Sequence, residues 1–127
     1  MARKALILLG AVMVLAACYS PRNKSRIAFV EHFGGTYRTS DVEIFETFAR
    51  EMPSGERRFV MVGAVPNKEL GGWNMVWAEV GRVGGSTYLP LEYPAAPVER
   101  ARSWDDARKA AARLRASLEE QWADSAP

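Results

Sequence analysis

The stretch RRFVMVGAV, residues 57–65, decides the fold of this chain. Its apolar side chains alternate between two faces and fill both, with Phe59, Met61 and Val65 on one and Val60, Val62 and Ala64 on the other. A strand with one solvated face would instead alternate apolar and polar residues. The stretch therefore predicts a strand that is covered on both sides.

A second strand is predicted over residues 73–80, after a turn at residues 66–69. It places Trp73, Met75 and Trp77 on one face. The segment also matches a helical stripe, but it spans only eight residues and has glycines on both flanks, which favours a strand.

A hairpin is predicted next, because Gly84 and Gly85 can form a tight turn into residues 86–93. Pro90 lacks the backbone donor that a central strand needs. This last strand is therefore expected at the edge of the sheet.

Upstream of the central stretch, residues 26–33 predict a strand with Ile27, Phe29 and Phe33 on one side. Ser40 and Glu43 then have the spacing of a capping box, which predicts the start of a helix. The apolar stripe of that helix consists of Ile44, Phe45, Phe48 and Met52. Pro53 is expected to end it.

The C-terminal segment predicts an amphipathic helix that begins after Ser103, a favourable capping residue. Its apolar stripe follows steps of three and four residues: Trp104, Ala107, Ala111, Leu114, Leu118 and Trp122. The predicted architecture is an α+β fold, an antiparallel sheet of about four strands with one or two helices packed on one face. Residues 26–127 should form one small globular domain.

Such a sheet would leave its second face with more apolar side chains than water favours. This surplus predicts that the free face, or an exposed strand edge, contacts a partner protein or a second copy of the chain.

The N-terminus has the order of a secretory leader. Arg3 and Lys4 precede an apolar run over residues 5–14, and the segment ends in Leu15-Ala16-Ala17-Cys18. A helix over residues 5–17 would extend roughly 20 Å, which is too short for a hydrocarbon core of about 30 Å.

The last four of these residues resemble the lipobox of bacterial lipoproteins. The resemblance implies that residues 1–17 are a signal peptide, that Cys18 receives a diacylglyceryl group, and that cleavage makes Cys18 the mature N-terminus. At least two acyl chains would then hold the protein stably on a membrane. The alternative is an ordinary signal peptide with an incidental cysteine, although Leu15 fits that cleavage pattern poorly.

The resemblance also bears on location. Tyr19 follows the cysteine in place of aspartate, which implies the outer membrane if the source has one, and otherwise the exported face of the cell membrane. Residues 18–25 are expected to be a short polar tether, with Pro21 opposing helix formation.

The charge of the chain bears on a nucleic-acid partner, and its cysteine content bears on disulfide bonds. The chain has 17 Lys and Arg against 15 Asp and Glu, and residues 1–17 contain two of the basic residues and no acidic one. The mature chain is thus neutral apart from one histidine, which gives no reason to expect a nucleic-acid partner. Cys18 is the sole cysteine, so no intrachain disulfide is expected.

Catalytic and metal-binding patterns are not found. His32 is the sole histidine and is expected to be a structural or surface residue, and no cluster has the ligand spacing of zinc. Glu43 and Glu46 are interpreted as part of a solvated helix face, and the glycine doublets as turns. No catalytic residue, metal or cofactor is predicted.

Aromatic residues are the better candidates for a contact surface, because Trp and Tyr contribute strongly at interfaces. The candidates are Trp73, Trp77, Tyr37 and Tyr88, although Trp73 and Trp77 also suit a core. Arg57 and Arg58 are interpreted as a solvated strand start.

Together these features predict a membrane-anchored, non-enzymatic lipoprotein of the cell envelope that binds another protein or serves as an accessory subunit. A glycan- or small apolar ligand-binding lipoprotein is the second hypothesis, and would show a tryptophan-lined cleft. A small envelope hydrolase is the third, and would need a cleft with His32 near a carboxylate.

Overall fold

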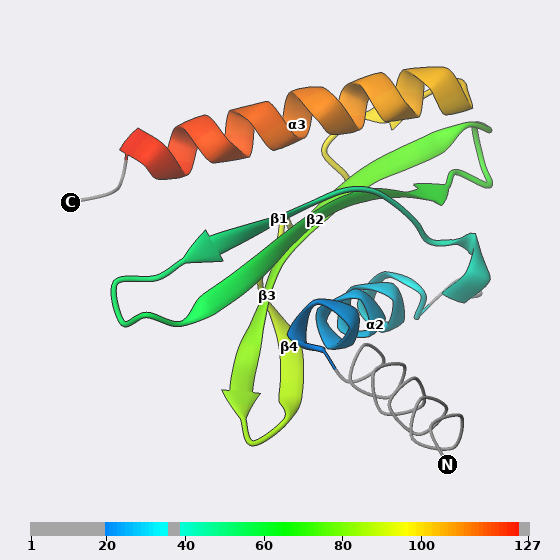
Figure 1. Ribbon diagram of the computed structural model, residues 1–127. Coiled ribbons are helices and arrows are strands. Elements are labelled where there is room, and N and C mark those ends of the chain that lie inside the picture. The colour runs from blue at the N-terminus through cyan, green and yellow to red at the C-terminus, as the bar shows by residue number, and fades with distance from the viewer. Residues whose placement is uncertain (1–19, 36–38, 125–127) are drawn as a thin grey trace, which may run out of the picture.

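The computed structural model describes residues 20–35 and 39–124. An antiparallel sheet is covered on one face by helix α2 (Pro21–Phe33) and on the other by helix α3 (Trp104–Asp124), as Figure 1 shows. The predicted α+β fold is confirmed. The prediction that the helices share one face is wrong, because the sheet lies between them.

The sheet is a meander of four main strands in the order β1-β2-β3-β4, and all neighbours are antiparallel. These strands are β1 (Glu43–Glu51), β2 (Arg57–Pro66), β3 (Trp73–Gly84) and β4 (Thr87–Glu92). A short fifth strand, β5 (Arg100–Ala101), pairs with the start of β3, and a 3₁₀ turn, Thr39–Asp41, precedes β1. The predicted strands over residues 57–65, 73–80 and 86–93 are confirmed, and β4 lies at the edge as Pro90 indicated.

Strand β2 is covered on both sides, as its sequence predicted. Phe59, Met61 and Val65 pack in the cluster between the sheet and α2. Val60, Val62 and Ala64 pack in the cluster between the sheet and α3. Each of these valine, methionine and phenylalanine side chains, when fully buried, stabilises the fold by about 1.5–3 kcal/mol.

Helix α2 corrects two predictions. Ser20 caps it, because the backbone N–H of Asn23 donates to the Ser20 Oγ at 3.2 Å, and Pro21 occupies the first turn. Proline favours that position, since its missing N–H would be unpaired there anyway. Residues 21–25, expected to be tether, are therefore helical, and the predicted strand over residues 26–33 is wrong.

Strand β1 replaces the helix predicted over residues 41–52. The pairing with β2 shifts register between Ile44 and Glu46, so Phe45 is the extra residue of a β-bulge. Ile44 packs toward α2, whereas Phe45 and Phe48 pack toward α3. The bulge breaks the two-residue alternation and leaves apolar spacings that resemble a helical stripe, which is why the prediction was wrong.

Helix α3 is confirmed from its first residue. The backbone N–H of Asp106 donates to the Ser103 Oγ at 3.1 Å, as expected of a capping serine. Ala107 and Ala111 of the predicted stripe are buried against the sheet with Ala110, and Leu118 completes the contact. Alanines at this interface allow the helix to approach the strands closely.

Candidate functional site

The apolar surface that motivated the partner prediction is covered. Val60 and Met61, which point to opposite faces of β2, are both fully buried, and Val76 is also buried. Because α2 and α3 occupy the two faces, the prediction of a free apolar face is wrong. Contact surfaces must therefore be sought at the ends and edges of the sheet.

Trp73 and Trp77 do not form one surface, because each pairs with a different residue of α3. The ring centroids of Trp73 and Trp104 lie 5.2 Å apart, and those of Trp77 and Trp122 lie 6.1 Å apart. Both strand tryptophans are half-buried. Much of each ring is thus covered by the core, in line with the alternative that the sequence left open.

The first of these pairs nevertheless reaches the surface. Phe45 joins it, with its ring centroid 4.9 Å from that of Trp104, and Trp104 keeps 43% of its surface exposed. We call the set Phe45, Trp73 and Trp104 the aromatic corner. Leu70, in the turn that leads into Trp73, is 70% exposed.

The other predicted contact residues lie elsewhere. Tyr88 is in β4 and packs against the α2 cluster, with the Lys24 Nζ 6.0 Å from its ring centroid. It is therefore on the opposite side of the sheet from the aromatic corner. Tyr37 and Cys18 lie outside the described residues, as does the leader sequence before Cys18.

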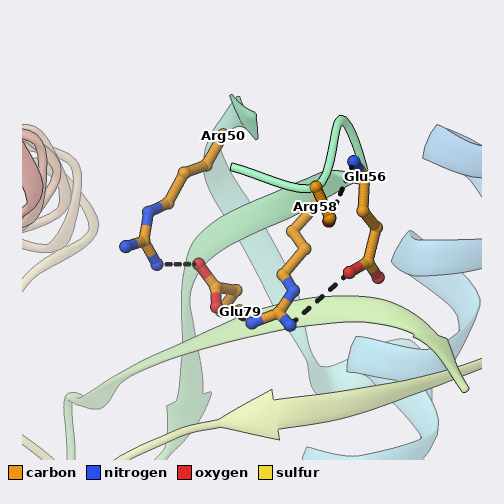
Figure 2. Close-up of polar contacts among 5 residues, drawn as sticks. Arg50, Glu56, Arg58 and Glu79 are labelled. Atoms are coloured by element: carbon orange, nitrogen blue, oxygen red, sulfur yellow. Dashed lines mark hydrogen bonds and ion pairs between the residues drawn. The ribbon is translucent and has the colours of Figure 1, made fainter. Parts of the chain in front are cut away.

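An ionic cluster lies on the side of the sheet that α3 covers, near Trp122, and Figure 2 shows its contacts. The Glu79 side chain is buried, and its two oxygens accept from Arg50 Nη1 at 2.7 Å and from Arg58 Nη1 at 2.9 Å. We call these three residues the Glu79 cluster. Each comes from a different strand, so the contacts connect β1, β2 and β3.

The two arginines of the Glu79 cluster form further contacts that fix their positions. Its hydrogen bond to Glu79 raises the pKa of the Arg58 guanidinium, and Glu56 adds a second carboxylate 3.5 Å from Arg58 Nη2. Arg50 also lies 4.4 Å from the centroid of the Trp122 ring. With both oxygens occupied, Glu79 is placed to stabilise the sheet rather than to transfer protons.

The sequence interpretation of Arg57 and Arg58 is therefore correct for only one of them. Arg57 is exposed, but the Arg58 side chain is about three-quarters buried and paired with Glu79. A signal was present in the sequence, since Glu79 occurs among apolar residues of a strand covered on both sides. Buried carboxylates require charged or hydrogen-bonding partners.

A groove of about 920 Å³ lies where the first turn of α2 meets β1 and the starts of two hairpins. Four arginines line it, namely Arg22, Arg57, Arg82 and Arg115. Glu56 is the acidic residue among its lining residues, and it faces Arg58. We call this feature the arginine groove.

His32 lies near the end of α2 and is exposed. Its ring is 4.3 Å from that of Tyr93, and the two residues line a pocket of about 240 Å³ with no carboxylate among its lining residues. Across residues 20–35 and 39–124, no group of His, Asp and Glu side chains is arranged to hold a metal ion. Glu43 and Glu46, interpreted as part of a solvated helix face, lie instead in strand β1, and Glu46 forms an ion pair with Arg115 at 2.9 Å.

Comparison with known protein families, with curated proteins and with solved structures finds no match to this chain. In the described part of the chain, no helix combines the length and the apolar character needed to cross a bilayer.

Proposed function

We propose that the protein is a lipid-anchored, non-enzymatic accessory protein of the cell envelope, held at Cys18, that binds a protein partner through the aromatic corner. The observation that supports the binding role most directly is that Trp104 is exposed while it packs against Phe45 and Trp73. The lipobox resemblance of Leu15-Ala16-Ala17-Cys18 carries the anchoring.

The aromatic corner has the properties of an interface hot spot. Trp104 packs on Phe45 and Trp73, which restricts its ring before any partner arrives. A preoriented tryptophan loses little rotational freedom on binding, and tryptophan is among the residues that contribute most at protein interfaces. Exposed Leu70 lies three residues before Trp73, in the adjoining turn.

The position of α2 supports a close association with the membrane. The helix begins at Pro21, so only two residues separate it from Cys18. Two acyl chains on that cysteine suffice for stable anchoring. The folded domain would then lie directly against the leaflet rather than at the end of a long tether.

The two other functions have less support. A glycan or apolar ligand would favour a tryptophan-lined cleft, but the arginine groove contains no tryptophan among its lining residues. A hydrolase based on His32 would favour a carboxylate near that ring, and the lining of its pocket contains none. Protein binding is therefore the function that these contacts support best.

Removing the Trp104 ring should weaken partner binding at least tenfold, a loss of about 1.4 kcal/mol or more, as expected for a hot-spot tryptophan. The full chain would carry a photoreactive amino acid at Leu70 and be cross-linked in cells of its source. We expect a discrete cross-linked product that Trp104→Ala removes.

Arg108→Ala is the matched control, because Arg108 is an exposed residue one helical turn further along α3. It should leave the cross-linked product unchanged. Equal cross-linking in the Trp104→Ala chain, or no product in the unsubstituted chain, would exclude the aromatic corner as the binding surface.

A further inference from the structure

Three arginines of the arginine groove form no ion pair within the described residues. Arg22, Arg57 and Arg82 are exposed, and within the described residues none of them forms a hydrogen bond or an ion pair. The fourth, Arg115, is neutralised by Glu46 at 2.9 Å and Glu119 at 2.7 Å. Two carboxylates lie close by: Glu51 is the cross-strand partner of Arg57, and Glu56 in the groove lining faces Arg58. The lining itself still contains four arginines against one glutamate.

This concentration is not a result of overall charge. After residue 17 the chain has equal numbers of basic and acidic residues. On α3, by contrast, Lys109 and Arg113 lie 3.1 and 3.6 Å from carboxylates of Asp105 and Glu99. Arg102 and Arg108 also form no ion pair in the described residues, but neither lines the groove. Several arginines gathered around one groove give it a local positive field, which attracts anions.

The groove also lies beside the anchor. Ser20, Pro21 and Arg22 form part of its wall. Two peptide units connect Ser20 to Cys18, so the cysteine can lie no further than about 7 Å along the chain from the groove. A lipid on Cys18 would therefore bring the groove to the level of the phospholipid headgroups.

We propose that the arginine groove binds the phosphate group of an anionic phospholipid headgroup in the anchoring leaflet. Guanidinium groups suit this ligand, because they donate paired hydrogen bonds to phosphate oxygens. The inference rests on the proposed lipid anchor at Cys18, and it assigns to the membrane the edge of the domain at β1, between the start of α2 and Arg115 of α3. The aromatic corner, on the α3 face, would then remain accessible to a protein.

The test uses the mature protein, purified from membranes in a neutral detergent, and measures binding by isothermal titration calorimetry. The probes are short-chain phosphatidylglycerol, short-chain phosphatidylcholine, inorganic phosphate and, in a separate titration, a glutamate-rich peptide. We expect saturable binding of phosphatidylglycerol that weakens with salt, and much weaker binding of phosphatidylcholine and inorganic phosphate. Each arginine near an anionic surface contributes about 1 kcal/mol, so Arg57→Gln with Arg82→Gln should weaken binding about 25-fold.

The control is Arg102→Gln with Arg108→Gln, two exposed arginines that do not line the groove. It should bind phosphatidylglycerol like the unsubstituted protein. Equal binding of phosphatidylglycerol and phosphatidylcholine, or an unaffected Arg57/Arg82 variant, would overturn the proposal.

Two further outcomes identify a different ligand. Inorganic phosphate that binds as tightly as phosphatidylglycerol would assign the groove to a free anion, and a glutamate-rich peptide that binds when the lipid does not would assign it to an acidic protein. Measuring the intact mass of the same preparation distinguishes a failure of the groove proposal from a failure of the proposed anchor. A lipidated Cys18 without phosphatidylglycerol binding refutes the groove alone, whereas an unmodified Cys18 refutes the anchor and the leaflet as the source of the ligand.

Discussion

Replacing Arg50 and Arg58 together with methionine should lower the free energy of unfolding by about 3–5 kcal/mol. The substitutions leave the Glu79 carboxylate fully buried without either of the cations that now hold its oxygens at 2.7 and 2.9 Å. A buried carboxylate loses hydration that only paired donors replace. Urea denaturation of the purified protein, followed by circular dichroism, measures the change.

Two comparisons make this prediction specific. Arg57→Met with Arg82→Met removes two exposed arginines that have no ion pair in the described residues, and should change the stability by about 1 kcal/mol or less. Adding Glu79→Leu to the Arg50/Arg58 variant removes the buried charge and should recover most of the loss. If the Arg50/Arg58 variant unfolds within 1 kcal/mol of the unsubstituted protein, the Glu79 cluster does not stabilise the sheet.

Truncating Phe29 to alanine should cost about 3–5 kcal/mol, because it removes a fully buried ring and leaves a cavity. Phe29 is one of the main contacts of α2 with the sheet, within the cluster that includes Met61 and Val76. Its ring also lies 4.7 Å from that of Phe33 on the same helix. Loss of the ring should therefore weaken the packing of α2 against the sheet.

Ile27→Ala provides the matched control two residues earlier on the same helix. Ile27 is 49% exposed, and alanine is a good helix former, so the change should be within about 0.5 kcal/mol. Thermal unfolding of the two variants side by side gives the comparison. Similar losses for both would mean that α2 does not dock through Phe29.

The elements that the sequence predicted correctly have one clear period each. Strand β2 alternates apolar residues on both faces, and α3 repeats them at three and four residues after a capping serine. The two wrong elements, β1 and α2, occur where the sequence does not show one clear period. The bulge at Phe45 gives β1 a spacing that resembles a helix, and Pro21, taken as a helix breaker, instead opens α2 at the position where proline is favourable.

The candidate sites were visible from the sequence to different extents. Glu79 could be noticed as a charged residue in an apolar strand, although its two partners lie 21 and 29 residues away. The arginine groove could not, because Arg22, Arg57 and Arg82 come from three distant segments that only the fold brings together. Trp73 stays a predicted contact residue, whereas its neighbour Trp104, assigned to the core stripe of the helix, is the more exposed of the two.

The two proposals give two surfaces of the domain separate roles. The arginine groove, beside the start of α2, would face the leaflet, and the aromatic corner, at the start of α3, would face a protein partner (Figure 1). The protein would thus hold its partner close to the membrane surface. The membrane role depends on the proposed lipid at Cys18.

Intact mass spectrometry of the protein extracted from its native membranes tests that dependence most directly. We predict the mass of residues 18–127 increased by a diacylglyceryl group and any further acyl chain on Cys18. A mass that corresponds to the unprocessed chain from Met1, or to a processed chain with a free Cys18 thiol, would contradict the account.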